Sequence, residues 1–135
     1  MKTTFDVLNT IYPVLNVASV TDLINGEVWR RKKPLNRQFQ DIVILSLPVS
    51  GEYDSDLQEG TFMVNIFCPN TRDGLPDETT LKSITDAVIL VLQDFEDTSS
   101  TGYFILTINS ENLMSDENDE MMSFVNIRVN YTLES

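Results

Sequence analysis

DETTLKSITDAVILVLQDF, residues 77 to 95, is the stretch around which the rest of the chain can be placed. At about 100° per residue, its charged side chains fall on one side of a helix and most of its apolar side chains on the other. The apolar stripe consists of Leu81, Ile84, Val88, Val91, Leu92 and Phe95. Asp77 and Glu78 favour the positive end of a helix dipole. The pattern predicts an amphipathic helix from Asp77 to Phe95 that packs on a sheet.

The N-terminal part of the chain predicts a second amphipathic helix, over residues 3 to 15, capped by Thr3 or Thr4. Its apolar positions recur three and four residues apart: Phe5, Leu8, Ile11, Tyr12 and Leu15. Pro13 is expected to terminate or kink this helix. One further helical turn is predicted over residues 19 to 25, with Ser19 or Thr21 as its cap, and then a short strand from Glu27 to Arg30.

Two hairpins supply the rest of the sheet. The first is predicted to join a strand from Asp41 to Val49, which ends at a sheet edge at Pro48, to a strand from Thr61 to Cys68 through an acidic loop. In the second of these strands the helix-facing side chains are expected to be Phe62, Val64, Ile66 and Cys68. The other hairpin is predicted to have arms at Tyr103–Asn109 and Met122–Leu133, joined by an acidic loop from Ser110 to Glu120. The inward side chains of its last arm are Val125, Ile127, Val129, Tyr131 and Leu133.

These elements predict an α+β fold. We expect a mainly antiparallel sheet of four to five strands with two helices packed on one face, while the other face is wet or contacts a partner. The 135 residues match a single domain, residues 1–135. The lone cysteine, Cys68, excludes an internal disulfide, and no apolar run is long enough for a signal peptide core or a membrane span. The sequence therefore predicts a soluble protein that stays inside the cell that makes it, without membrane contact.

The net charge of −12 is divided unevenly along the chain. Residues 1 to 50 carry 6 basic and 4 acidic side chains, whereas residues 51 to 135 carry 3 basic and 17 acidic ones. Five of the nine basic residues lie within eight positions: Arg30, Arg31, Lys32, Lys33 and Arg37. We expect them to form an exposed basic patch that either solubilises a loop or docks on an acidic protein surface.

The chain lacks the residues that several classes of catalytic and metal-binding site require. The chain has no histidine, so Ser-His-Asp and Cys-His arrangements are excluded. The acidic runs at Asp54–Asp56 and Asp116–Glu120 invite a calcium interpretation, but the sixth and twelfth positions counted from Asp116 are Met121 and Ile127, where a calcium loop needs glycine and glutamate. No phosphate-binding glycine loop or cysteine cluster is present. We therefore predict no catalytic residue, no cofactor and no metal.

The basic patch also raises the possibility of nucleic-acid binding. A net charge of −12 repels a phosphate backbone everywhere except at this patch, and Trp29 is the one aromatic residue interleaved with it. Sequence-specific nucleic-acid binding is therefore not predicted.

Leu90 departs from the pattern of the helix from Asp77 to Phe95. It lies opposite the apolar stripe, between Asp86 and Asp94 on the neighbouring turns. Either it is an ordinary exposed leucine, or it contributes to a contact between copies of the chain. With the five basic residues, it completes the predicted protein-interface set.

The order of these elements resembles a known family. The residues that carry the resemblance are the N-terminal FDVLNTIYPVL, the segment INGEVWRRKKP, the DIVI and VNIF strands, a helix, and a closing hairpin that ends in VNIRVNY. Together they resemble the tail-completion and tail-terminator proteins of long-tailed bacteriophages and prophages. The resemblance covers nearly the whole chain, but no single residue is diagnostic.

The resemblance implies a non-enzymatic α+β protein that assembles as a hexameric ring on the head-proximal end of the tail tube. Such a protein stops tube polymerisation, joins the tail to the head connector, and is found in the host cytoplasm during assembly and then in the virion tail. The two-ended charge distribution is compatible with head-to-tail contacts between copies. Two other functions remain open: an acidic inhibitor or anti-defence protein that mimics nucleic acid, and a small-ligand-binding domain, which would need a polar-lined pocket.

Overall fold

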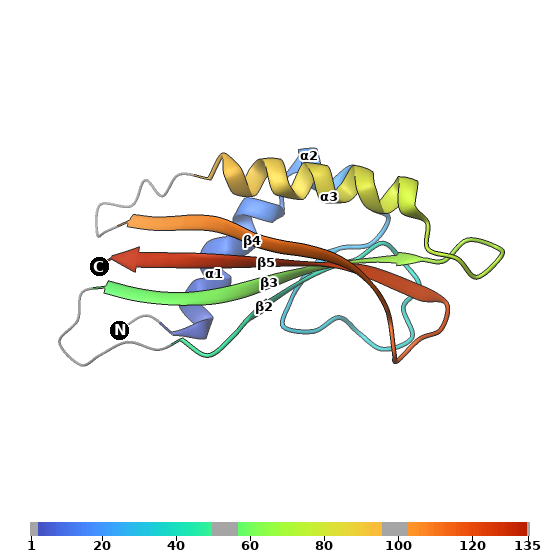
Figure 1. The fold of residues 1–135 in the computed structure, drawn as a ribbon, viewed down its shortest axis with the longest axis horizontal. Coiled ribbons are helices and arrows are strands. Elements are labelled where there is room, and N and C mark those ends of the chain that lie inside the picture. The colour runs from blue at the N-terminus through green and yellow to red at the C-terminus, as the bar shows by residue number, and fades with distance from the viewer. Residues whose placement is uncertain (1–2, 50–56, 96–102, 135) are drawn as a thin grey trace.

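The computed structural model describes residues 3–49, 57–95 and 103–134, which form three helices and one sheet (Figure 1). In chain order the elements are α1 (Thr4–Leu15), α2 (Ala18–Thr21), β1 (Val28–Arg30), β2 (Ile42–Ser46), β3 (Leu57–Pro69), α3 (Glu78–Gln93), β4 (Tyr103–Ser115) and β5 (Met122–Glu134). The predicted α+β class is confirmed.

The sheet has five strands in the order β1-β2-β3-β5-β4. β1 pairs with β2 in parallel, and the three other pairs are antiparallel. β3 and β5 pair along their full length, from Leu57 opposite Glu134 to Pro69 opposite Met122, and form the centre of the sheet. β1 and β4 are therefore the two outer strands, and α1 begins at the same end of the molecule at which β5 finishes (Figure 1).

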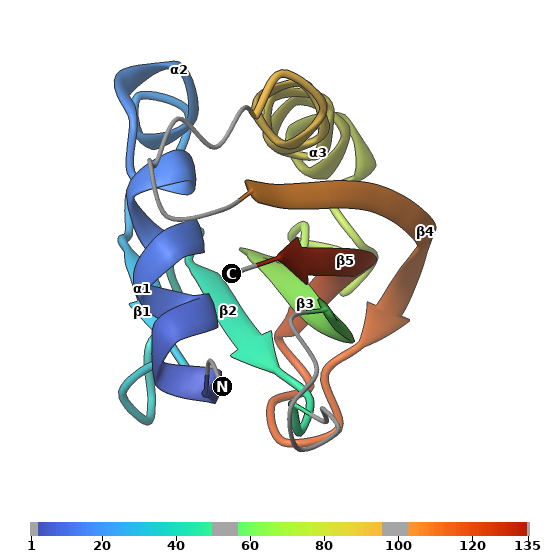
Figure 2. The same cartoon turned by 90° about the vertical axis from the view of Figure 1, so that its left-hand side faces the viewer.

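The helices cover one face of this sheet. α1 packs on β1 and β2, and α3 packs on β3, β5 and β4, so the two helices, which run in different directions and contact each other, together cover the core (Figure 2). The predicted inward residues of β3 and β5 are all buried there: Phe62, Val64, Ile66, Cys68, Val125, Ile127, Val129, Tyr131 and Leu133. Gly60 faces Tyr131 across the two strands, and an added Cβ would lie 2.3 Å from the tyrosine Oη.

α1 begins as predicted. The Thr3 side chain accepts from the Asp6 amide, and the Asp6 carboxylate accepts from the Thr3 amide, which makes a capping box. Pro13 does not end the helix at once, because its missing N–H falls on the exposed side of the last turn, and the helix runs on to Leu15. α2 is shorter than predicted, and neither Ser19 nor Thr21 caps it, since its N-cap is Val17 without a side-chain bond.

α3 confirms the predicted stripe. Asp77 is its N-cap and accepts from the Thr80 amide, while Leu81, Ile84, Val88 and Leu92 are buried. The helix ends at Gln93, and Phe95 beyond it is half-buried against Phe104, with ring centroids 6.1 Å apart.

Two predicted loops are wrong in part. Leu57–Gly60 belongs to β3, and Ser110–Ser115 belongs to β4, which leaves a turn at residues 116–121. The remainder of the first acidic loop, including Asp54, lies outside the described residues. Ser110–Ser115 is polar because β4 is an outer strand whose side chains are exposed there, and its register shifts between Ile108 and Ser110.

The first strand of the first hairpin is shorter than predicted, because β2 ends at Ser46 and Pro48 lies beyond it. β2 is flanked by β1 only from Ile42 to Ile44, so the chain around Pro48 runs beyond the end of β1, where proline removes no hydrogen bond of the β1–β2 pair. The face of the sheet opposite the helices remains partly open. It carries Met63, Asn65 and Phe67 of β3 and Phe124 of β5, and Phe67 and Phe124 lie with ring centroids 5.0 Å apart.

Candidate functional site

The basic segment follows β1 and crosses from the α1 side to the open face of the sheet. Arg30, Arg31 and Lys32 are exposed, whereas Lys33 and Arg37 are half-buried. Arg31 has a left-handed backbone, with φ of 71°, and its amide donates to the Ile44 carbonyl at 2.7 Å. This conformation is costly for a residue with a Cβ, and it turns the chain away from the sheet directly after β1.

Two arginines attach the segment to α1. The Arg30 guanidinium lies 4.7 Å from the Tyr12 ring centroid and donates to Asn9 at 2.8 Å. Arg31 makes the corresponding pair of contacts one turn and more towards the helix start: its guanidinium lies 4.5 Å from the Phe5 ring centroid and donates to Thr4 at 3.0 Å. These contacts fix the start of the segment, since cation–π pairs at exposed sites contribute about 0.5–1 kcal/mol each.

Lys32 and Lys33 differ in their surroundings. The Lys33 Nζ lies 4.3 Å from the Phe67 ring centroid on the open face and donates to the Arg37 carbonyl at 3.4 Å. The Lys32 side chain has no hydrogen bond or ion pair with any described residue. Lys32 is therefore the member of the predicted basic patch that is most accessible to a partner.

Arg37 contacts a buried carboxylate. Its Nε and Nη2 donate to the two oxygens of Asp41 at 3.1 Å, and its guanidinium lies near the rings of Trp29 and Phe39. Asp41 is fully buried and also accepts from the Glu27 amide at 2.9 Å and the Trp29 Nε1 at 3.0 Å. Arg37 therefore attaches the basic segment to the folded core through Asp41.

The surroundings of Asp41 set its ionisation. Burial acts to raise the pKa of the Asp41 carboxyl, but hydrogen bonds from Arg37, Trp29 and Glu27 outweigh burial and hold that pKa below its ordinary value. The hydrogen bond between Arg37 and Asp41 also raises the pKa of the Arg37 guanidinium. The charged pair is therefore a fixed part of the fold around neutral pH.

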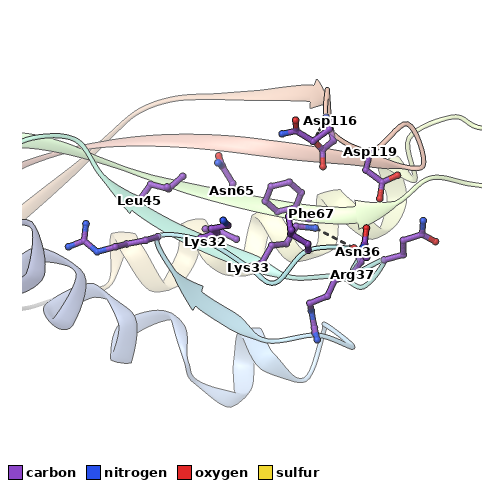
Figure 3. Close-up of a pocket in the computed structure, with 14 residues that line it drawn as sticks. Lys32, Lys33, Asn36, Arg37, Leu45, Asn65, Phe67, Asp116 and Asp119 are labelled. Carbon is purple, nitrogen blue, oxygen red and sulfur yellow. Dashed lines mark hydrogen bonds between the residues drawn. The ribbon is translucent and has the colours of Figure 1, made fainter.

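A groove of about 540 Å³ lies between the basic segment and the open face of the sheet (Figure 3). Its floor is apolar, with Val43, Leu45 and Phe67, and Asp116 and Asp119 of the β4–β5 turn stand on the side away from the lysines. The complete lining is Arg31, Lys32, Lys33, Leu35, Asn36, Arg37, Gln38, Val43, Leu45, Asn65, Phe67, Asp116, Asn118 and Asp119. Such a surface, apolar in the middle with charges at its margins, suits contact with a protein.

Neither acidic residues nor the cysteine forms a chemical site in the described part of the chain. Asp116 accepts from the Asn118 amide and Asp119 from the Met121 amide, so both carboxylates shape the turn. No group of acidic or cysteine side chains that could hold a metal ion occurs among the described residues. Burial raises the pKa of the Cys68 thiol to about 11, with a further contribution from Asp77, so this thiol is protonated at neutral pH and a poor nucleophile.

None of the described helices is both long and apolar enough to cross a bilayer.

Leu90 projects from α3 on the side away from the core, with 57% of its surface exposed. Whether a second copy covers it stays a prediction. We expect Leu90→Asp to change the free energy of unfolding by about 0.5 kcal/mol or less, since an exposed leucine loses little on substitution. Thermal melting and sedimentation of the variant separate the two functions considered for it. Unchanged melting with lost self-association supports a contact, whereas unchanged melting with intact self-association removes Leu90 from the interface.

A second surface was missed by the sequence analysis. Glu111 and Leu113 of β4 line a groove beside α3, but they fall in the segment that was predicted as an acidic loop. The available signal was the apolar pair Leu113 and Met114 inside that otherwise polar stretch.

The fold, but not the sequence, has a counterpart among known proteins. No protein-family model matches the sequence, and no curated protein matches it. Among solved structures, a chain from the virion of a native gene transfer agent particle superposes with a TM-score of 0.62 and 12% identity, over 93% of this chain and 92% of that chain. A second solved chain reaches a TM-score of 0.46 at 12% identity, over 80% of this chain and 79% of that one, which is too distant to use. The fold is thus shared, nearly end to end, with a virion component.

Proposed function

We propose that the protein is a non-enzymatic virion component that caps the head-proximal end of a phage tail tube and joins it to the head connector. The observation that carries the proposal is the end-to-end match in fold with a chain of a gene transfer agent virion. The element order and the motifs that resemble tail-completion proteins point the same way. Copies of the chain form a ring, hexameric by that resemblance, in the host cytoplasm during assembly and in the finished virion tail.

The surfaces described above support this role. The basic segment presents Lys32, whose side chain has no partner among the described residues, beside a groove with an apolar floor, and Leu90 is exposed on the opposite, helix-bearing side. A ring-forming protein that also contacts the tube and the connector needs several such surfaces on one small domain. We assign Arg30, Arg31, Lys32 and Lys33 to contacts with an acidic surface, either the neighbouring copy or the tail tube.

Reversal of charge at Lys32 tests the role of the basic segment. Because Arg30 and Arg31 hold the segment on α1, they are left in place, and Lys32→Glu is compared with Arg72→Glu, which changes an exposed basic residue elsewhere. Both variants are expected to melt like the wild type, since exposed charges contribute about 0–1 kcal/mol. Gold-labelled wild-type protein and Arg72→Glu should decorate one end of purified tail tubes in electron micrographs, and Lys32→Glu should not.

The same experiment can contradict the proposed cap, or only the assignment of the basic segment to its contact. Wild-type protein that decorates tubes along their sides, or not at all, is incompatible with a cap. Equal decoration by Lys32→Glu and wild type removes the basic segment from the contact while leaving the cap itself in place.

A further inference from the structure

We propose that the basic segment of one copy docks in the groove between α3 and β4 of a second copy, with Leu35 seated on the groove's apolar floor. The inference rests on the proposed function in one respect only, that copies of the chain associate. It adds the two surfaces that meet.

The α3–β4 groove is a part of the core that the helix leaves uncovered. It has a volume of about 370 Å³ and is lined by Glu78, Leu81, Lys82, Thr85, Asp86, Ile89, Glu111, Leu113 and Val125. Leu113 is 37% exposed although its pairing partner Val125 is buried. The Thr85 hydroxyl, in a residue that is only 7% exposed, has no hydrogen-bond partner among the described residues.

The register shift in β4 creates this surface. Up to Ile108 the even-numbered residues of β4 face the core, and after the shift Glu111 and Leu113 pair with Ile127 and Val125, which point to the helix-bearing face. Both side chains therefore lie on the α3 side rather than on the open face. Beyond these two side chains lies the outer edge of β4, which is one of the two outer strands of the sheet.

The basic segment has a matching shape. Leu35 is 79% exposed, which makes it the most exposed large apolar side chain in the described part of the chain. It stands at a tight bend, since the following Asn36 has a left-handed backbone with φ of 60°. A leucine at the tip of a fixed bend can enter a groove with little loss of conformational entropy on binding.

Charge complementarity selects the occupant. The rim of the groove carries the carboxylates Glu78, Asp86 and Glu111 against one ammonium group, Lys82, which already pairs with Asp86. Arg31, Lys32 and Lys33 precede Leu35 and are separated from it only by Pro34. Opposite charges around an apolar centre favour this pair of surfaces over contacts between like surfaces.

The two surfaces belong to opposite edges of the sheet. The basic segment follows β1, and the groove is bordered by β4, the other outer strand (Figure 2). One copy therefore offers a projection at one edge and a recess at the other, so contacts between copies are head to tail. Such contacts close into a ring or continue as a filament.

Cross-linking between two single-cysteine variants tests the contact. The native Cys68 is buried and its thiol protonated, so an added cysteine is the reactive one. Leu35→Cys and Leu113→Cys are mixed at concentrations at which sedimentation shows the wild type to self-associate, and treated with a short bis-maleimide. We expect cross-linked dimers from the mixture and a ladder of larger species from the double variant. The matched control pairs Leu113→Cys with Leu23→Cys, which places a cysteine at an exposed leucine outside both surfaces, and should give no dimers above background.

A charge exchange provides the second readout. Lys32→Glu or Glu111→Lys alone should weaken self-association about tenfold, the scale of one close charge pair, and the two together should restore it. The inference is overturned if the wild type stays monomeric at every concentration, if Leu35→Cys links to Leu113→Cys no better than Leu23→Cys does, or if Leu35→Cys links mainly to itself. Decoration of tail tubes by the same variants is scored separately, so a failed cross-link with intact capping rejects the contact alone.

Discussion

Asp41→Ala is expected to destabilise the protein by about 3 kcal/mol, because it leaves the Arg37 guanidinium, the Trp29 Nε1 and the Glu27 amide without their shared acceptor. For a chain of this size that corresponds to a fall in melting temperature of roughly 10 °C. Trp29 is the only tryptophan, so its fluorescence reports both the local contact and global unfolding. Asp41→Asn keeps an acceptor for two of the donors and should fall between the wild type and Asp41→Ala.

The chain contains its own control for this prediction. Lys82 and Asp86 form the other described ion pair with the same four-residue spacing, but both side chains are exposed. Asp86→Ala should cost less than about 1 kcal/mol. Equal effects of the two substitutions would mean that the buried carboxylate does not hold the segment in place.

The contribution of Asp41 has a defined dependence on pH. Its folded-state pKa lies below the ordinary 3.8, so the stabilisation is fully present above that value and is lost as the pH falls through the folded-state pKa. The difference in unfolding free energy between the wild type and Asp41→Asn should therefore be constant near neutral pH and shrink in acid. A difference that grew as the pH fell would contradict this assignment.

Gly26→Ala is the second substitution expected to have a large effect. A Cβ at this position would lie 2.1 Å from the Asp41 Oδ1 and 2.6 Å from the Gln40 carbonyl oxygen. The backbone oxygen cannot move cheaply, because it accepts the Gly26 amide at 3.0 Å, and a shift of the carboxylate would break its bonds to Arg37 and Trp29. We expect a loss of about 3 kcal/mol, at the upper end of overpacking effects.

Gly74→Ala provides the comparison for Gly26→Ala. An added Cβ at Gly74 meets no atom within 4 Å, so only its φ of 78° opposes the substitution. The expected cost is about 1 kcal/mol, and denaturant unfolding of both variants measures the difference. If Gly26→Ala were as stable as Gly74→Ala, Gly26 could not lie as close to the Asp41 carboxylate as described.

The elements that could be predicted from the sequence are those with a strong pattern. The buried stripe of α3 and the alternation of β5 follow from burial on one side, which leaves a clear period in the residues. The second half of β4 could not be found in this way, since an outer strand with both sides exposed tolerates Ser110, Glu111 and Asn112 as a loop does. This part of β4 is a strand because it forms hydrogen bonds with β5, and a local sequence pattern does not reveal such pairing with a distant segment.

The candidate site shows a similar division. The exposed position of Leu90 followed from helix geometry, and the basic cluster followed from the composition of eight residues. The different surroundings of its members did not. Arg30 and Arg31 contact α1, which depends on how distant segments pack, and Arg37 pairs with Asp41, four residues further along the chain and buried in the fold. A cluster of like charges in a sequence thus contained anchoring residues as well as accessible ones.

The length distribution of tail tubes tests the central claim most directly. In electron micrographs of particles from cells that lack this gene, tail tubes should not be joined to heads. Their lengths should vary, and many should exceed the length found when the gene is present. Expression of the gene from a plasmid should restore one length and joined heads. Joined tails of normal length without the gene would contradict the account, and would favour the acidic inhibitor or the ligand-binding domain instead.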